Sequence, residues 1–456
     1  MIDRLVVFGG TGDLMGRYLL PALAALRAGG HLSDGFQLVG ASREGMDDER
    51  YRSWASDWLA RQAPEIDSAA KETLVKSASY RQLDLTDPAN VAACLAGEGP
   101  VAAYLALPPA VFPMAVSALK QAGLPLESQV VLEKPFGEDL ESAQALNRLL
   151  AELVDERHVF RVDHFLAMTT VQNVLGTRLA NRVLEPLWNS AHIEEVEIIW
   201  EETLALEGRA GYYDGVGALK DMVQNHLFQL LCLVAMEPPI SLGERDLRDR
   251  KVDVLRSVRP LEEADVATHT RRARYRAGRI RDRDVPAYVD EDGVTPSRGT
   301  ETFAEVVLEL DSWRWSGTRF RIRTGKAMGE NRMEVVVNFR PAPALPFAGS
   351  VPNRLRFGLL PEGLNFELTG IGPSGELSLV PLTLSAEMEP PELPAYGRIL
   401  LDVLHGNSAL SIRADEAEHA WEILTPVLEG WSRNVAPLEE YDAGSDGPAS
   451  TLERRR

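Results

Sequence analysis

The chain has 456 residues, which predicts more than one domain, because single hydrophobic cores rarely serve more than about 250–300 residues. Hydrophobic residues make up 45% and charged residues 25%, proportions typical of a globular enzyme. The net charge of -20 argues against nucleic acid or an anionic membrane as a partner, because phosphate binding requires clustered lysine and arginine.

Neither the cysteines nor the hydropathy indicates a secreted or membrane protein. Cys94 and Cys232 are far apart and predict neither a disulfide framework nor a metal site, and the apolar run around Cys232 predicts a buried thiol. Residues 2–4 lead directly into a strand-like run rather than a signal peptide, and no apolar stretch reaches the ~20 residues that span a bilayer. We therefore expect a cytoplasmic protein with no membrane partner and no bound metal.

The chain opens with the parts of a dinucleotide-binding turn. Residues 5–8 are β-rich, residues 9–14 read Gly-Gly-Thr-Gly-Asp-Leu, and apolar spacing predicts a helix from Leu14 to Leu26. Such a strand, turn and helix present backbone N–H groups and a helix N-terminus to a pyrophosphate. Met15 replaces the third glycine of the G-x-G-x-x-G pattern, so an ordinary βα turn is the alternative.

The end of the second predicted strand, residues 36–39, bears on the choice of cofactor. An NAD-selective site carries an acidic residue there, about 20 residues after the glycines, to hold the ribose 2′-hydroxyl. Here that position is small and is followed by Arg43, a residue type that suits a 2′-phosphate. The sequence therefore favours NADP, although Glu44 is adjacent.

Two later apolar runs, residues 102–107 and 129–132, predict further strands of a doubly wound sheet, because strands covered on both faces are apolar throughout. The first run ends at Pro108, and the second is followed by Glu-Lys-Pro-Phe-Gly at residues 133–137. Ligands bind at the carboxyl ends of parallel strands, so Lys134 is a candidate site residue. A surface lysine at a turn is the alternative.

Two more strand-like runs end in acidic residues. Residues 158–162 are followed by the pair Asp163 and His164, and residues 194–200 are followed by Glu201 and Glu202. Most adjacent Asp-His pairs are surface hydrogen bonds or capped turns, so this pair gains weight only from the motifs around it.

The segment 212–231 predicts a helix with an uneven distribution of polar residues. Its second half is apolar on almost every side, and its first half carries Asp221, Gln224, Asn225 and His226. Buried polar groups are costly unless they are hydrogen-bonded, so this cluster indicates a ligand or a network, with a structural role as the alternative.

Together these motifs resemble the glucose-6-phosphate dehydrogenase family, in register over essentially the whole chain. The motifs stand at residues 9–14, 19–23, 104–109, 133–137, 161–164, 221–226, 320–326, 414–416 and 441–445. The resemblance implies an α/β plus α+β fold. A Rossmann dinucleotide-binding domain at residues 1–165 is expected to precede a β+α substrate-binding and oligomerisation domain at residues 166–456, built on a large, mainly antiparallel sheet. It also implies a homodimer or homotetramer.

The resemblance further implies NADP-dependent oxidation of the C1 hydroxyl of a glucopyranose, glucose 6-phosphate in the family, to the 1,5-lactone. His226 matches the general base and Asp163 the carboxylate that orients it, and histidine suits a base because it titrates near neutral pH. The residues that match sugar ligands are Lys134, His164, Glu202, Asp221 and Lys326. The residues expected at the cofactor are Gly9, Thr11, Gly12, Asp13, Leu14, Arg43, Pro108 and Lys134.

The chain departs from the family where the phosphate is held. After Asp-His the family reads Tyr-Leu-Gly-Lys-Glu, whereas here Phe165 and Met168 replace the tyrosine and the lysine. Charge-assisted hydrogen bonds contribute about 1.5–3 kcal/mol each, so this loss weakens phosphate binding by roughly two orders of magnitude or more unless another cation compensates. Glucose 6-phosphate and a glucose with an uncharged or modified C6 group are therefore alternative substrates.

Neighbouring residues offer replacement donors. His164 is retained, and the hydroxyls of Thr169 and Thr170 follow the altered motif. Asn331 stands where the family has an arginine, but Arg332 is adjacent.

Two other classes of protein are alternatives. A catalytically silent homologue would bind the cofactor without turnover, but it would have no need of His226. A reductase of the Gfo/Idh type also carries Glu-Lys-Pro after a Rossmann domain, but the pair of Asp163 and His164 and the whole-chain register argue against it.

The remaining segments are less informative. Residues 240–300 are rich in arginine and aspartate and predict exposed connections and helices, whereas residues 303–310 and 334–339 predict sheet strands. A polar tail is expected after Glu439.

Overall fold

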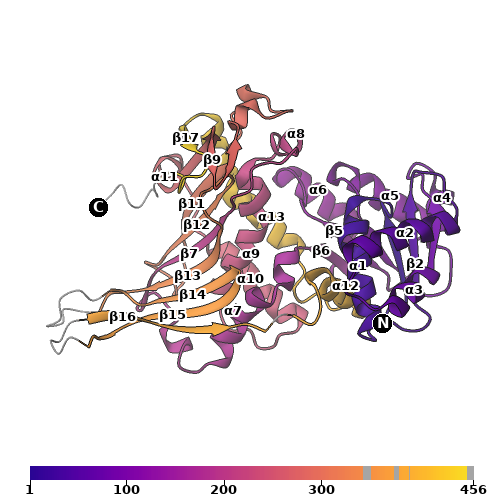
Figure 1. Cartoon of the computed structure of the whole chain (residues 1–456), viewed down its shortest axis with the longest axis horizontal. Coiled ribbons are helices and arrows are strands. Elements are labelled where there is room, and N and C mark those ends of the chain that lie inside the picture. Colours follow the sequence, from indigo (N-terminus) through magenta and orange to yellow (C-terminus); the bar gives the residue numbers. More distant parts are fainter. Residues whose placement is uncertain (343–350, 374–378, 390, 449–456) are drawn as a thin grey trace. The chain divides into compact units, whose positions relative to one another are not determined.

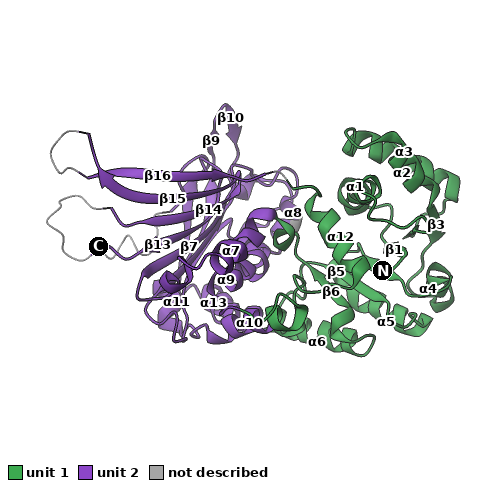
Figure 2. Ribbon diagram, turned by 90° about the horizontal axis from the view of Figure 1, so that it is seen from below, with its two compact units in different colours: residues 1–168, 239–248, 390–418 green, residues 169–238, 249–389, 419–456 purple. Residues whose placement is uncertain are grey.

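The computed structural model describes residues 1–342, 351–373, 379–389 and 391–448. The chain divides into two compact units (Figure 2). The first contains Met1–Met168, Pro239–Arg248 and Pro390–Glu418, and the second contains Thr169–Pro238, Asp249–Glu389 and His419–Arg456. The domain boundary between residues 165 and 166 stays a prediction, since two later segments group with the first unit.

A six-stranded parallel sheet forms the centre of the first unit. Its strands are β1 (Arg4–Phe8), β2 (Gln37–Ser42), β3 (Ala78–Gln82), β4 (Ala102–Leu105), β5 (Gln129–Glu133) and β6 (Val159–Val162). They lie in the order β3-β2-β1-β4-β5-β6, with helices on both faces (Figures 1 and 2). This is the strand order of a doubly wound dinucleotide-binding domain, so the predicted Rossmann fold is confirmed.

Most helices of the first unit begin at aspartate caps. The helices are α1 (Leu20–Ala28), α2 (Asp48–Gln62), α3 (Ser68–Lys76), α4 (Pro88–Leu95), α5 (Phe112–Ala122), α6 (Leu140–Ala151) and α12 (Ala395–His405). The carboxylates that accept first-turn N–H groups of α2, α3, α4 and α6 belong to Asp47, Asp67, Asp87 and Asp139. These caps satisfy donors that a helix start leaves unpaired.

The first predicted helix is not uniform. A π-helical segment, η1 (Met15–Leu19), precedes α1 where a single helix from Leu14 to Leu26 was expected. Met15 is fully buried in the core, and the next residue, Gly16, lies against helix α2. A Cβ on Gly16 would lie 2.5 Å from the Trp58 indole of α2.

The segment from Pro390 to Glu418 joins the first unit through a buried arginine. Arg161 of β6 is fully buried, and its guanidinium donates to Glu156 Oε1 at 2.7 Å and Asn147 Oδ1 at 2.8 Å. Its backbone N–H donates to Ser411 Oγ at 2.9 Å, and Ile412 N–H donates back to the Arg161 carbonyl at 3.1 Å. A charge buried this deeply requires such partners, so the segment is an integral part of this unit.

A nine-stranded sheet forms the second unit, in the order β16-β15-β14-β13-β7-β12-β11-β8-β17. The strands are β7 (Ile193–Glu201), β8 (Thr270–Arg276), β11 (Phe303–Glu309), β12 (Arg319–Gly325), β13 (Arg332–Phe339), β14 (Arg354–Leu360), β15 (Glu362–Ile371), β16 (Leu379–Glu387) and β17 (Leu438–Asp442). Among the described strands of this sheet, only the pairs β7–β12 and β8–β17 are parallel. The predicted large, mainly antiparallel sheet is confirmed.

Two interpretations of the second unit were wrong. Residues 240–300 contain β8 and a small hairpin of β9 (Gly278–Ile280) and β10 (Arg283–Val285), in addition to helices. Of the predicted polar tail after Glu439, residues 440–442 belong to β17, which pairs with β8, and residues 449–456 lie outside the described residues. Arginines on β8 face acids on β17, as in the Arg271–Glu439 pair at 2.5 Å, and this pairing lets a sequence without an apolar pattern form strands.

Helices cover one face of this sheet (Figures 1 and 2). They are α7 (Thr169–Ala180), α8 (Ala210–Tyr213), η6 (Leu219–Leu227), α9 (Phe228–Ala235) and α11 (Glu263–His269); α10 (Glu244–Ser257) and α13 (Ala414–Ser432) contribute residues to both units. Every residue of α9, including Cys232, is buried, as predicted. None of the described helices is long and apolar enough to cross a membrane.

Candidate active site

A cavity of about 690 Å³ lies at the carboxyl ends of β1 to β4 in the first unit. Five predicted cofactor residues line it: Gly9, Thr11, Gly12, Arg43 and Pro108. Asp13, Leu14 and Lys134 are not among the described residues that line it. Residues 82–86, which line the cavity at the end of β3 and just beyond it, were not predicted, although the carboxyl end of a parallel strand was a usable signal.

The glycines of the turn are required by backbone geometry. Gly9 has φ +92°, and a Cβ there would lie 2.0 Å from the carbonyl oxygen of Ala106. A Cβ on Gly10 would lie 2.6 Å from the Cα of Gly40, so only glycine lets β1 end this close to β2. The cavity has the size of a ligand site, and its floor is a turn that a Cβ would fill, so the residues present fit a dinucleotide.

One acidic and one basic side chain face the same cavity beside the turn. The Thr11 hydroxyl donates to the Glu44 carboxylate at 3.2 Å, and Thr11 N–H donates to Ser42 Oγ at 3.1 Å. Arg43 is exposed and forms no ion pair within the described part of the chain. The Arg43 guanidinium at the edge of the cavity can therefore bind an anionic group, while the Glu44 carboxylate is hydrogen-bonded to Thr11.

A half-buried carboxyl, that of Glu133, lies at the end of β5, immediately before Lys134. Glu133 accepts a hydrogen bond from the Tyr104 hydroxyl at 2.5 Å and a second from Tyr396 of α12. Burial raises the pKa of Glu133 to about 7, although the two tyrosine hydroxyls act in the opposite direction. Nearby Asp163 adds to the rise, and Lys134 opposes it. This network was not predicted.

Asp163 and His164 follow β6 at the start of a short helix, η4 (His164–Ala167). Asp163 is 4% exposed, and its carboxylate accepts the N–H of Phe165 at 2.9 Å. The His164 ring stacks on Tyr396 with 5.9 Å between centroids, and the buried Phe165 ring meets its edge. An apolar ring therefore occupies the position where the family motif has a hydroxyl.

In the second unit, two predicted sugar ligands form an ion pair. Strands β7 and β12 are parallel with Glu201 opposite Gly325, so the residues that follow, Glu202 and Lys326, lie side by side. Their side chains form a salt bridge and are 17% and 19% exposed. The Tyr441 hydroxyl donates to the Lys326 carbonyl at 2.6 Å, which fixes the end of β12.

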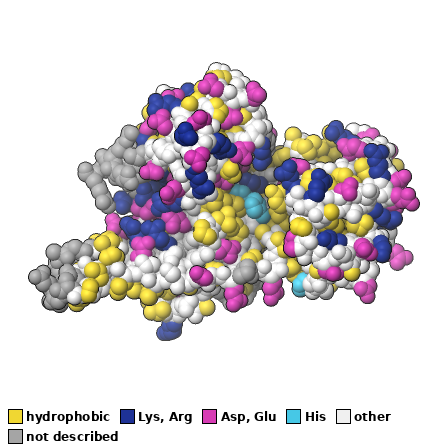
Figure 3. Space-filling model, viewed as in Figure 1, with side chains coloured by type: hydrophobic (Ala, Val, Ile, Leu, Met, Phe, Trp, Pro, Cys, Tyr) yellow, Lys and Arg dark blue, Asp and Glu magenta, His cyan; other side chains and the backbone are white. Residues whose placement is uncertain are grey.

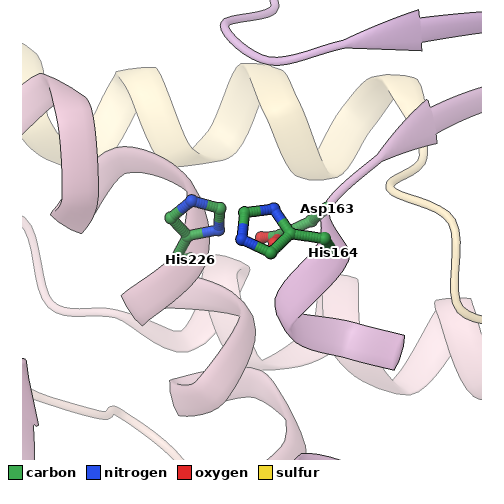
Figure 4. Close-up of side chains that lie close together, drawn as sticks. All are labelled: Asp163, His164 and His226. Atoms are coloured by element: carbon green, nitrogen blue, oxygen red, sulfur yellow. The ribbon is translucent and has the colours of Figure 1, made fainter. Parts of the chain in front are cut away.

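The remaining predicted residues, Asp221 and His226, lie on the π-helix η6. His226 is 2% exposed, its backbone N–H donates to Asn225 Oδ1 at 2.7 Å, and Asn225 donates to the Lys220 carbonyl. Asp163 and His164 come from the segment after β6, whereas His226 comes from η6 (Figure 4). π-Helical segments are rare in proteins, but those that occur often lie at functional sites. This supports a functional rather than a structural role for the polar cluster.

The residues that could replace the family's phosphate ligands differ in whether they already have hydrogen-bond partners. Arg332 bonds Glu334 at 2.6 Å, and Asn331 accepts the N–H of Thr203 at 2.8 Å, so both are engaged within the sheet. Thr169 and Thr170 begin α7, and their buried hydroxyl oxygens have no hydrogen-bond partner among the described residues.

Family comparisons agree with this arrangement. Residues 6–173 match the model of the glucose-6-phosphate dehydrogenase NAD binding domain, and residues 175–454 match that of the glucose-6-phosphate dehydrogenase C-terminal domain. The chain belongs to the glucose-6-phosphate dehydrogenase family. It is therefore an oxidoreductase of carbohydrate metabolism with a nicotinamide dinucleotide cofactor.

Relatives of this family match the chain from end to end. Glucose-6-phosphate 1-dehydrogenase of Zymomonas mobilis is 39% identical, with 99% of this chain and 97% of that protein covered. The enzyme of the same name from Mycolicibacterium smegmatis is 40% identical, with 99% and 95% covered. A glucose-6-phosphate dehydrogenase solved in complex with its substrate glucose-6-phosphate superposes with a TM-score of 0.91 at 28% identity, over 99% of this chain and 96% of that one.

Proposed function

We propose that the protein oxidises the C1 hydroxyl of a glucopyranose to the 1,5-lactone with NADP, and that glucose 6-phosphate is its first candidate substrate. The observation that carries the proposal is the pairing of Glu202 and Lys326, two charged residues expected at the sugar, on adjacent strand ends. Whole-chain similarity to enzymes named glucose-6-phosphate 1-dehydrogenase supports the same reaction.

His226 is proposed to take the proton of the C1 hydroxyl, while Asp163 orients the imidazole and stabilises its charged form. The bound nicotinamide supplies the acceptor for the hydride that leaves C1. Lys134, His164, Asp221, Glu202 and Lys326 are proposed to hold the sugar, because carboxylates and cations fix the directions of hydroxyl hydrogen bonds. The sugar loses two electrons and two hydrogens, one as hydride and one as the proton on His226.

NADP is favoured over NAD by Arg43. Its exposed guanidinium lines the cavity without an ion-pair partner in the described residues, and a planar guanidinium suits a 2′-phosphate. Gly9, Thr11 and Gly12 are proposed at the diphosphate, with Asp13, Leu14, Pro108 and Lys134 nearby.

Initial rates test this proposal. Formation of reduced cofactor is followed with glucose 6-phosphate and with glucose, each with NADP and with NAD. Turnover that is faster with NADP and lost in His226→Ala is expected. Absence of turnover with both sugars and both cofactors would leave two alternatives, a modified hexose as the substrate or a catalytically silent homologue.

A second candidate is the same reaction on a glucose without a C6 phosphate. It is favoured by the buried Phe165 ring against His164 and by the engagement of Arg332 with Glu334. A kcat/KM for glucose equal to or above that for glucose 6-phosphate would select this candidate.

The protein is further proposed to form a homodimer or homotetramer through the sheet of the second unit. β16 is an edge strand of the described sheet, and Leu382 and Leu384 on it are 50% and 61% exposed. Hydrophobic side chains are visible on the surface of the molecule in Figure 3. Arginines and glutamates pair on the central strands β7 and β12 of the same sheet, for example Arg321 with Glu195 and Glu197, and such paired charges suit an interface between two copies of the chain. Sedimentation of a Leu382→Lys, Leu384→Lys variant as a smaller species than the unchanged protein is expected.

A further inference from the structure

Helix η6 starts against a buried carboxylate that no motif indicated. Glu301, 8% exposed, stands just before β11, and its Oε1 accepts the N–H of Leu219 at 3.0 Å. Its backbone carbonyl accepts the N–H of Ala218 at 3.1 Å. One residue thus satisfies two successive N–H groups at the start of the helix, from 82 positions further along the chain.

A glycine lets this carboxylate reach the helix. Gly217 has φ +76°, and a Cβ there would lie 2.5 Å from Glu301 Oε1. Any larger residue would push the carboxylate away from the first N–H groups of η6. The turn and the acid are therefore matched to each other.

Few charged groups of the described residues act on Glu301. Arg272 of β8 and Lys220 of η6 are the cations that act on it, and Tyr213 of α8 and Tyr288, on a short turn after β10, are the titratable hydroxyls affected by it. Burial raises the pKa of Glu301 to about 7, against the hydrogen bond from Leu219 and these cations. Its charge thus changes within the neutral pH range.

We propose that Glu301 is a positioning residue that holds η6 so that Asp221 and His226 face the sugar. The inference rests on the proposed function, because it gives these two residues their roles. A carboxylate at a helix N-terminus is stabilised by the helix dipole, and a π-helix has little stability of its own, so the cap has a large influence on where η6 begins. Asp221 lies two positions after Leu219 and is affected first.

The variants Glu301→Ala and Glu301→Gln distinguish the hydrogen bond of the Glu301 side chain to η6 from the effect of its negative charge. Alanine removes the acceptor, while glutamine keeps an acceptor and imitates the protonated acid. Glu309→Gln, on the following strand and ion-paired with Arg259, controls for loss of a carboxylate in this unit. Measurements at pH 6 and pH 8.5 give kcat, the KM for the better sugar and the KM for the cofactor.

Glu301→Ala is expected to raise the sugar KM about tenfold and to lower kcat about tenfold, with the cofactor KM within about twofold, since loss of a helix cap has an effect of this order. Glu301→Gln is expected to match the unchanged protein at pH 6 and to show a sugar KM several-fold higher at pH 8.5, where the native acid is charged. A merely structural role would not produce this pH-dependent rescue.

Amide hydrogen exchange tests the inference even without turnover. Exchange at residues 219–227 is expected to be at least about tenfold faster in Glu301→Ala than in the unchanged protein or in Glu309→Gln. Unchanged exchange in this helix, or a glutamine variant that differs from the native protein equally at both pH values, would overturn the inference. If neither sugar reacts but exchange accelerates, glucose 6-phosphate and glucose would be rejected as substrates, while the capping role of Glu301 would be supported.

Discussion

The cofactor turn of the first unit and helix η6 of the second unit are built in different ways. The turn consists of neighbours in sequence, Gly9 to Gly12, and its shape is set by backbone that has no room for a Cβ at Gly9 and Gly10. Helix η6 takes its cap from Glu301, 82 residues away, and the proposed sugar-binding pair, Glu202 and Lys326, joins residues 124 apart. A site formed by backbone, such as this turn, is built from residues adjacent in sequence. A site formed by side chains brings together residues that are far apart in sequence and requires the complete fold.

This difference predicts which function each substitution affects. Changes in the turn should weaken cofactor binding and lower the free energy of unfolding. Changes in the second unit should weaken sugar binding and slow the chemical step. Four substitutions test the separation, from the largest expected effect to the smallest.

Replacing the base should have the largest effect. His226→Ala is expected to lower kcat by about 10²–10⁴-fold, because proton removal from C1 loses its acceptor. Binding of NADP, measured by fluorescence titration, should stay within about twofold. His192→Ala, an exposed histidine before β7, serves as the control. A His226→Ala enzyme with near-normal kcat would remove this residue from the chemistry.

Gly9→Ala should act through the backbone. The positive φ and the 2.0 Å contact with the Ala106 carbonyl predict a loss of roughly 3 kcal/mol or more in the free energy of unfolding, together with weaker cofactor binding. Gly35→Ala is the matched control, because a Cβ there meets no atom closer than 4.0 Å. Denaturant unfolding and cofactor titration compare the two. Equal stability of both variants would contradict the role given to backbone geometry.

Glu133→Gln should change how stability depends on pH. The pKa of Glu133 is raised from 4.5 to about 7 in the folded protein, so the stability associated with its protonated form is present below pH 4.5 and is lost as pH rises through 7. Between pH 5 and 8.5 the free energy of unfolding of the native protein should fall by roughly 2–3 kcal/mol relative to that of the glutamine variant. Unfolding curves at both pH values measure this, with the exposed Glu98→Gln as control.

Lys326→Met should have the smallest effect, and this effect should be limited to sugar binding. Loss of one charge-assisted contact is expected to raise the sugar KM by about 10–100-fold while the cofactor KM stays constant. The exposed Lys76→Met controls for general charge effects. An equal rise in the cofactor KM would break the proposed separation between the two units.

The sequence was sufficient for the local part of this architecture. Apolar runs predicted β1, β4 and β5, because strands covered on both faces need little else, and the glycine turn identified the cavity. The arginine-rich β8 was missed, since its side chains are satisfied by acids on β17 that pairing alone brings near. Glu133 and Glu301 were missed for the same reason: their partners, Tyr396 and Leu219, are adjacent only after folding.

The central claim is that the family's sugar chemistry is kept while the tyrosine and lysine that hold the phosphate are lost. The most direct test restores them in Phe165→Tyr, Met168→Lys and compares kcat/KM for glucose 6-phosphate and for glucose with those of the unchanged protein. We predict that the ratio of the two values rises by roughly a hundredfold in favour of the phosphate ester, as two charge-assisted contacts return. An unchanged ratio would contradict the claim and would show that other groups of this chain already hold the phosphate.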